Sequence, residues 1–182
     1  MKPTVKPQRP YFSSGPTAKH PGWSLETLQQ ALVGRSHRAP VSLTRIQELL
    51  SLTREILEIP QDYVLALMPG STTGAMESAL WSLLGPTPVD VFSSDVFGDG
   101  WIYDIVSQLK IPEMHPASGI YPAPFRGAMP DLSRARAHHD LVFTANGTTA
   151  GVILTDLSSW IVDNKDRLVL CDATSLVFAA PL

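Results

Sequence analysis

The chain has 182 residues, of which 44% are hydrophobic, so it is long enough for one ordinary domain with a sizeable core. Its formal net charge is -3 and it has no basic stripe, which argues against nucleic acid as a partner. Cys171 is the only cysteine, no apolar run reaches membrane-spanning length, and the N-terminus has no apolar segment typical of a secretory signal. We therefore expect a cytoplasmic protein that has no internal disulfide and does not enter a membrane.

The first 24 residues are rich in proline and glycine, which prevent a helix. Tyr11, Phe12 and Trp23 make this stretch more apolar than a free tail. We predict an extended N-terminal arm over residues 1–24 that lies across a surface, such as that of a partner subunit. The alternative is a disordered leader.

Two helices are expected next, separated by a basic loop. Ser24 is a candidate N-cap for a helix to about Val33, and a second, amphipathic helix is predicted over residues 42–57. The loop between them carries His37 and Arg38, and guanidinium groups bind carboxylate or phosphate through paired hydrogen bonds. The alternative is a solvated basic turn.

The most informative stretch covers residues 63–85. An apolar run at 64–68 predicts a buried strand, and the small residues at 69–74 predict a tight turn. The apolar residues after this turn recur at helical spacing and predict a helix. The first N–H groups of a helix have no partner within it and lie at its positive end, so Thr72 and Thr73 are candidates for binding a phosphate. The alternative is an ordinary helix cap. The turn lacks the Gly-Lys-Ser/Thr of a nucleotide-binding P-loop and the three-glycine dinucleotide fingerprint.

Further strands and helices alternate along the rest of the chain. Strands are predicted at 89–92, 140–144 and 167–172, and helices at 97–109 and 131–138. A helical or turn segment is predicted at 158–164 and an irregular segment at 114–130. Trp101 is expected near a helix start, either as a pocket wall or as a core or interface residue. His138 and His139 are interpreted as surface residues, since neighbouring residues on a helix face different ways and no third metal ligand has suitable spacing.

This alternation predicts an α/β fold with a mainly parallel sheet and helices on both faces. Three polar clusters then follow strands: the turn with Thr72 and Thr73, the turn 145–151 with Thr148, and Asp172. Open α/β sheets bind ligands at the carboxyl ends of their strands, so we expect these clusters to converge on one site.

Six motifs, in the same order, resemble the phosphoserine aminotransferase family, within the class-V, fold-type-I aminotransferases that depend on pyridoxal 5'-phosphate (PLP). They are FSSGPTAKHPGWS, GRSHRAP, PGSTTGAMESALWSLLG, FGDGW, NGTTAGV and LCDATS, and they run nearly from end to end of the chain. The resemblance implies that residues 25–182 form the N-terminal part of the PLP-binding large domain. It also implies a homodimer at full length.

The resemblance also implies roles for individual residues. Thr72 and Thr73 would hold the cofactor phosphate, Trp101 would stack on the pyridine ring, Thr148 would bind the ring hydroxyl, and Asp172 would pair with the ring nitrogen. His37 and Arg38 would bind the anionic groups of phosphoserine, 3-phosphohydroxypyruvate, glutamate and 2-oxoglutarate. Some members of the family have an arginine where Thr73 stands.

One departure concerns the catalytic lysine. The family carries a Ser-x-x-Lys segment after the aspartate strand, whose lysine forms the Schiff base with the cofactor. None of the lysines of this chain, which are Lys2, Lys6, Lys19, Lys110 and Lys165, stands in that context. We therefore expect the Schiff-base lysine to lie beyond Leu182, the chain to be an N-terminal fragment, and the isolated chain to be inactive as a transaminase.

Two alternatives remain at this stage. The chain could belong to another class-V aminotransferase that acts on serine, alanine or glyoxylate, although the Ser-His-Arg loop favours a phosphorylated substrate. It could also be a non-catalytic remnant that binds PLP or phosphate.

Overall fold

The computed structural model describes residues 5, 19–125, 127–155, 157–164 and 166–179. The chain divides into two units, Met1–Leu52 and Thr53–Leu182, and each is described by itself. Tyr11 and Phe12 of the predicted arm lie outside the described residues. No helix in the part of the chain that the structure describes has both the length and the apolar character of a membrane span.

The first unit contains η1, a 3-10 helix at Leu25–Gln30, and most of the helix α1 at Pro40–Ile56. The prediction of α1 is confirmed, and the helix begins two residues earlier than expected, since proline is favoured at the first helical position. The predicted helix to Val33 is wrong in type and length. Ser24 has extended backbone but its side chain makes no capping hydrogen bond, and Leu25 and Leu28 are exposed rather than on a buried face.

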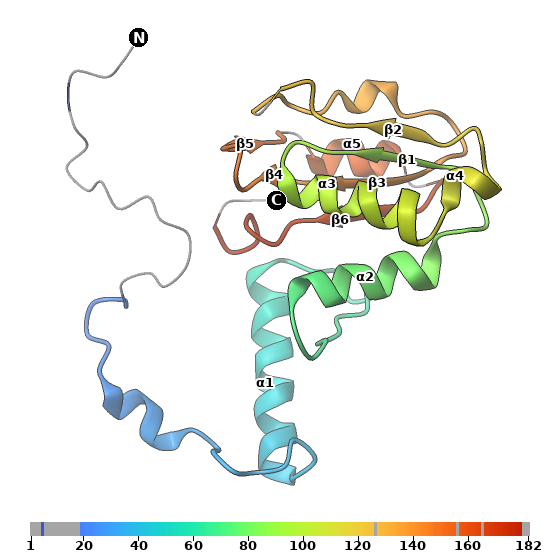
Figure 1. Cartoon of the computed structure of the whole chain (residues 1–182). Helices are drawn as coiled ribbons and strands as arrows, with labels where there is room; N and C mark the ends of the chain where they lie inside the picture. The colour runs from blue at the N-terminus through green and yellow to red at the C-terminus, as the bar shows by residue number, and fades with distance from the viewer. Residues whose placement is uncertain (1–4, 6–18, 126, 156, 165, 180–182) are drawn as a thin grey trace. The chain divides into compact units, whose positions relative to one another are not determined.

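The second unit is built on a parallel sheet (Figure 1). Its strands are β1 (Val89–Phe92), β2 (Gly119–Tyr121), β3 (Asp140–Thr144) and β6 (Val169–Asp172), in the order β2-β1-β3-β6. Every neighbouring pair in this sheet is parallel. A small antiparallel pair, β4 (Asn146–Gly147) and β5 (Val152–Ile153), follows β3. The predicted strands β1, β3 and β6 and the parallel α/β class are thus confirmed.

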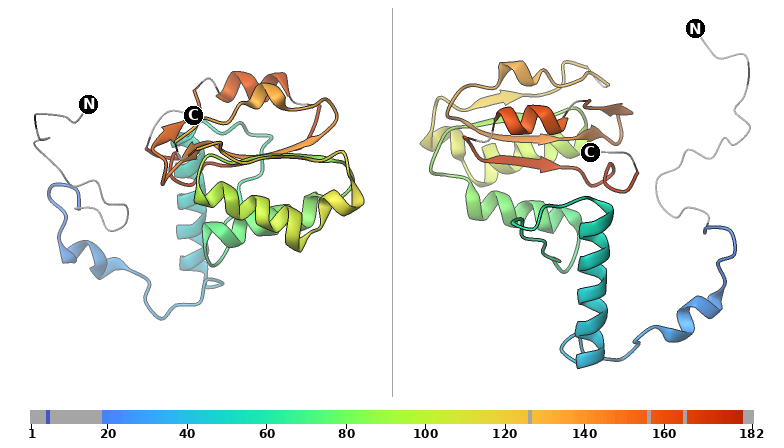
Figure 2. Two further views of the ribbon diagram at one scale, coloured as in Figure 1. Left: turned by 45° about the horizontal axis from the view of Figure 1, so that its top comes forward. Right: turned by 180° about the vertical axis from the view of Figure 1, so that it is seen from behind.

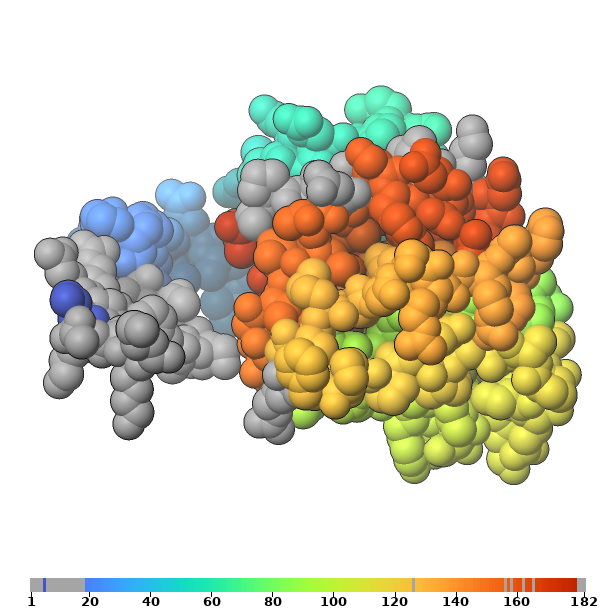
Figure 3. Space-filling view, turned by 90° about the horizontal axis from the view of Figure 1, so that it is seen from above, coloured from blue at the N-terminus to red at the C-terminus, as the bar shows by residue number. Residues whose placement is uncertain are grey.

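Helices cover both faces of the sheet, as predicted. The helices are α2 (Thr72–Leu83), α3 (Val96–Tyr103), η2 (a π-helical turn, Asp104–Gln108), α4 (Ile111–Met114), η3 (a 3-10 helix, Leu132–Arg134) and α5 (Leu157–Asp163). Figure 2 shows α3 on one face and, from behind, α5 on the other. The described part of the segment between β2 and β3, yellow to orange in Figure 3, forms the surface at the β2 edge.

The core lies in two layers, one on each side of the sheet. The first joins α2, α3 and η2 to the sheet through Leu80, Val89, Val91, Trp101, Ile105, Ile111 and Val142. The second joins the other sheet face to α5 through Phe92, Leu141, Phe143, Ala145, Leu157 and Leu176. Burial of these side chains provides the main driving force for folding of this unit.

The predicted strand at residues 64–68 is wrong. The structure places these residues in an irregular segment, and Val64 is 94% exposed. A strand forms only where another strand satisfies its N–H and C=O groups, and within the described residues β6 pairs on one side only, with β3. A short apolar run cannot show from its pattern alone whether such a partner exists.

Two predictions about the segment before β3 are also wrong. The irregular stretch at 114–130 contains β2, whose Ile120 pairs with Val91. The helix expected at 131–138 is reduced to η3, so the helical argument about the two histidines does not apply. His138 is exposed in a left-handed turn (φ 65), but His139 is 12% exposed and its Nδ1 lies 3.2 Å from Oδ1 of buried Asp90.

Candidate functional site

A pocket opens at the carboxyl edge of the sheet, where β3 ends at Thr144 and β6 ends at Asp172. These two residues are paired in the register of the strands. The pocket is lined by Thr72, Thr73, Phe97, Trp101, Thr144, Asn146, Thr148, Asp172, Thr174 and Ser175. All five residues that the sequence analysis selected as cofactor-binding therefore lie around one hollow. They come from four separate segments of the chain.

The start of α2 forms one wall. Ser71 is the N-cap, and its hydroxyl accepts a hydrogen bond from the N–H of Gly74 at 3.1 Å. The ordinary capping role that the sequence left open thus belongs to Ser71. Thr72 and Thr73 are the first two helical residues, where backbone N–H groups lack partners within the helix and the helix dipole is positive. This wall suits an anion.

Trp101 forms a second wall from α3. It is the sixth residue of that helix rather than a residue of its first turn, because Asp95 caps α3 one residue before Val96. Trp101 is 5% exposed and belongs to the first core layer, so both roles considered for it from the sequence apply. Its indole N–H donates a hydrogen bond to Oδ2 of Asp172 at 3.1 Å.

Asp172 is held in place by three donors. Besides the indole of Trp101, the backbone N–H and the hydroxyl of Thr174 donate to its Oδ1 at 3.0 and 2.6 Å. A carboxylate can accept about four hydrogen bonds. Asp172 therefore retains acceptor capacity for one N–H group of a ligand in the pocket.

Thr148 lies in the turn that joins β4 to β5, and its hydroxyl is 2.7 Å from that of Ser175. The turn packs closely against the end of β1. A Cβ on Gly147 would come within 2.8 Å of a Val152 methyl group and 3.0 Å of the Ser94 hydroxyl, so only glycine fits there. This contact fixes the position of the Thr148 turn beside the sheet.

Sequence reasoning missed four residues of the lining, Phe97, Thr144, Thr174 and Ser175, and assigned no role to Asn146, which stands in the predicted polar turn. These residues stand in or next to the motifs that supplied the predicted site residues. Their nearness in sequence to those motifs was the signal that could have identified them. Asp95 was also missed. Its partner Thr149 is 54 residues away, and nothing in the local sequence indicates that pairing.

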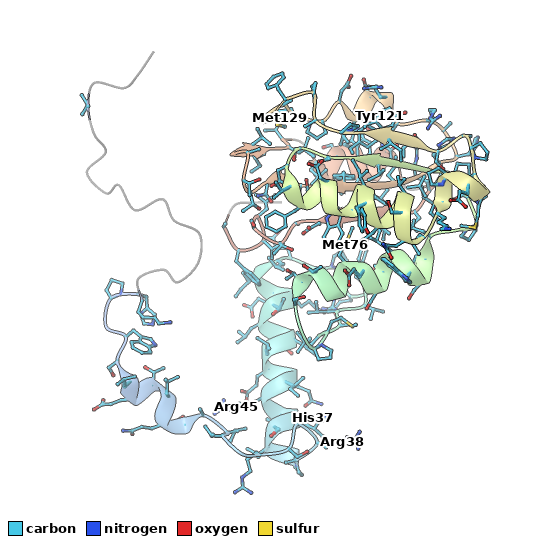
Figure 4. The ribbon with its side chains drawn as sticks, in the orientation of Figure 1. His37, Arg38, Arg45, Met76, Tyr121 and Met129 are labelled. Carbon is cyan, nitrogen blue, oxygen red and sulfur yellow. The ribbon has the colours of Figure 1, made fainter. Side chains whose placement is uncertain are left out.

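His37 and Arg38 belong to the first unit, in the loop before α1, and both are exposed (Figure 4). The backbone N–H of Arg38 donates to the Ser36 hydroxyl at 3.1 Å, which shapes the loop. Their role in binding substrate stays a prediction.

The titratable groups near the pocket include one thiol. Burial, together with the neighbouring Asp172 charge, raises the pKa of Cys171 to about 12, so its thiol is uncharged at neutral pH. The described residues contain no cluster of three or more His, Cys, Asp or Glu side chains that could hold a metal ion. The polar groups that line the pocket are hydroxyls, helix N–H groups, an indole, a carboxylate and the side-chain amide of Asn146.

Comparison with known proteins identifies two curated relatives. The chain is 44% identical to a phosphoserine aminotransferase of Methanosarcina barkeri and 45% identical to one of Methanosarcina mazei, in each case over 179 residues. These matches cover 98% of this chain and 47% of each relative, so the chain spans about half the length of the curated relatives it matches. No protein-family model and no solved structure matches it.

Proposed function

Because the chain is similar over nearly its whole length to phosphoserine aminotransferases, we propose that it is part of such an enzyme. The reaction would convert 3-phosphohydroxypyruvate and glutamate to O-phosphoserine and 2-oxoglutarate, in serine biosynthesis, with PLP as cofactor. The observation that carries this proposal is the gathering of Thr72, Thr73, Trp101, Thr148 and Asp172 around one pocket.

The residues present fit PLP by their chemistry. The α2 N-terminus offers N–H groups and hydroxyls to a phosphate, the flat indole of Trp101 offers a surface to an aromatic ring, and Asp172 has room for one ring N–H. The hollow that these residues line is small and partly open to solvent.

When bound, PLP supplies an electron sink for the carbanion that forms when the substrate loses its α-proton. The contribution of Asp172 would be electrostatic, because a carboxylate beside the ring nitrogen favours the protonated form of that nitrogen. Trp101 orients the carboxylate through its indole N–H. Thr72 and Thr73 would bind the phosphate, and Thr148 the ring hydroxyl.

Several finer points belong to the same proposal. His37 and Arg38 would bind the anionic groups of the substrate, and full-length protein would form a homodimer in the cytoplasm. Residues 25–182 would form the N-terminal part of the PLP-binding large domain, preceded by an arm at 1–24. The basic loop favours a phosphorylated substrate over serine, alanine or glyoxylate, since a phosphate requires additional cations. Relative turnover of phosphoserine and serine by full-length protein distinguishes these substrates.

Titration of the purified chain with PLP and, separately, with pyridoxal tests the proposal. The wild type is compared with a Thr72→Val/Thr73→Val double variant, which keeps side-chain shape but removes both hydroxyls. Thr44→Val is the control, because the Thr44 hydroxyl only donates to the Pro40 carbonyl within α1.

We expect the double variant to bind PLP about tenfold more weakly, since hydrogen bonds to a charged group are among the stronger ones. Binding of pyridoxal, which has no phosphate, should change little, and Thr44→Val should match the wild type. A wild type that does not bind PLP, or that binds PLP and pyridoxal equally well, contradicts the proposal.

A further inference from the structure

Asp95 is a buried carboxylate that joins two parts of the pocket wall. It is 5% exposed and lies between β1 and α3. Its Oδ1 accepts hydrogen bonds from the N–H groups of Phe97 and Gly98, at 3.0 and 3.3 Å. Its Oδ2 accepts from the N–H and the hydroxyl of Thr149, at 2.9 and 3.2 Å. One side chain therefore holds a helix with one oxygen and a distant turn with the other.

Each of these two attachments leads to a residue of the pocket. The α3 side carries Trp101, less than two turns after the cap, and the Thr149 side is adjacent to Thr148. The four donors are neutral N–H and O–H groups, and the positive end of α3 favours the negative charge on Asp95. A carboxylate is the side chain that can accept from both directions at once.

The surroundings of Asp95 leave little room for movement. A Cβ on Gly98 would come within 2.8 Å of the Ser93 hydroxyl, so the start of α3 packs directly on the end of β1. The Ser94 hydroxyl lies 3.2 Å from that of Thr144, which lines the pocket at the end of β3. A change in the Asp95 contacts should therefore be transmitted to the pocket rather than absorbed locally.

We propose that Asp95 is a positioning residue that sets the placement of Thr148 relative to Trp101 and so the geometry of the pocket. The inference rests on the proposed function where it concerns PLP. Asp95 does not line the pocket itself, so it acts through the residues that it holds.

The test uses Asp95→Asn in the whole chain. Asparagine is as good an N-cap as aspartate, so its oxygen can still bind the amides of Phe97 and Gly98. Its amide nitrogen then faces the N–H of Thr149 and cannot accept from it. Asp95→Ser is a second variant, in which a short hydroxyl caps α3 but does not reach Thr149. Asp131→Asn is the matched control, because Asp131 caps η3 through Ser133 and is exposed and outside the pocket.

The first readout is hydrogen exchange of backbone amides in the chain without ligand. We expect exchange at Thr149 to accelerate by about tenfold or more in both Asp95 variants, because its N–H loses a charged acceptor. Exchange at Gly98 should change much less, since the cap persists. Asp131→Asn should leave both amides unchanged. Unchanged exchange at Thr149 in both Asp95 variants overturns the inference.

The second readout is the dissociation constant for PLP, which we expect to rise by about fivefold or more in both Asp95 variants and not in Asp131→Asn. An unchanged PLP affinity in the Asp95 variants overturns the inference while leaving the proposed function intact. A wild type that binds no PLP refutes the proposed function instead. In that case the rate of hydrogen exchange at Thr149 is the one readout that tests whether Asp95 holds the turn.

Discussion

The indole N–H of Trp101 donates to the carboxylate of Asp172 at 3.1 Å, across 71 residues of sequence. This bond joins a helix on one face of the sheet to the carboxyl end of an edge strand. It presents an aromatic surface and an acidic group side by side in one pocket. The relationship explains why a buried tryptophan of the core also has a polar function at the pocket edge.

Trp101→Phe should weaken PLP binding by about fivefold to tenfold, because Asp172 loses one of its three donors while an aromatic ring is retained. The measurement is a PLP titration of the purified variant. Trp81→Phe is the control, since Trp81 is 48% exposed on α2 and does not line the pocket. Equal losses in the two variants would show that the indole N–H has no special role.

Acid stability should depend on Asp90. Burial alone would raise the pKa of Asp90, but hydrogen bonds from Arg136 and the charges of His139 and Arg136 outweigh burial and lower it below 3.8. A lowered pKa gives stability that is present above the unfolded value and is lost as the pH falls through the folded value. Asp90→Asn should reduce the free energy of unfolding by about 2 kcal/mol at pH 7, with the difference between the two proteins shrinking as the pH falls below the unfolded value of about 3.9.

Urea unfolding at a series of pH values checks this expectation. Asp62→Asn removes the same charge at an exposed position and serves as the control. If the free energies of unfolding of wild type and Asp90→Asn differ by the same amount from pH 7 to pH 2, ionisation of Asp90 does not stabilise the fold. The Arg136 side chain is 43% exposed, and solvent weakens its attraction to Asp90. The loss of unfolding free energy in Asp90→Asn should therefore be smaller than for an ion pair in which both partners are buried.

Cys171 should react slowly with thiol reagents in the folded chain. Its pKa is raised to about 12 by burial and by Asp172, and the thiolate is the reactive form. We expect the reaction at pH 8 to be at least about a hundredfold slower than in urea-unfolded chain, where the pKa returns to about 8.5. The rate of a disulfide exchange reagent, followed by absorbance, measures this. Comparable rates in the two states would refute it.

The strands of the sheet were predictable where apolar runs had clear boundaries. β1 and β3 were placed at their observed bounds because Pro88 precedes one run and a polar turn follows the other. Residues 64–68 show the limit of this reasoning. Whether an apolar run becomes a strand depends on a partner elsewhere in the chain, and within the described residues none pairs with it.

The same strand boundaries account for Thr148 and Asp172, since side chains that follow parallel strands meet at one sheet edge. Thr72 and Thr73 were expected after a strand that the structure does not contain, so strand ends do not explain their place in the pocket.

The contacts between distant residues could not be predicted. Asp95 contacts Thr149 across 54 residues of sequence, and His139 contacts Asp90, and no local sequence pattern indicates either contact. His139 was misplaced because the expected helix is only the short η3, and the left-handed turn at His138 directs the chain into β3.

The isolated chain should not catalyse transamination. The described residues that line the pocket include no lysine, and a lysine is the residue type that binds PLP covalently. The assay supplies PLP, glutamate and 3-phosphohydroxypyruvate to purified chain, with the relative of Methanosarcina mazei as the positive control. Turnover above background would contradict this prediction.

The most direct test of the account is a PLP titration of isotope-labelled chain followed by NMR. The indole N–H of Trp101 and the backbone N–H groups of Thr72, Thr73 and Thr148 are its reporters. We predict that their resonances shift together and saturate at one dissociation constant. If PLP leaves these four signals in place, or shifts only signals from elsewhere in the chain, the pocket does not bind the cofactor.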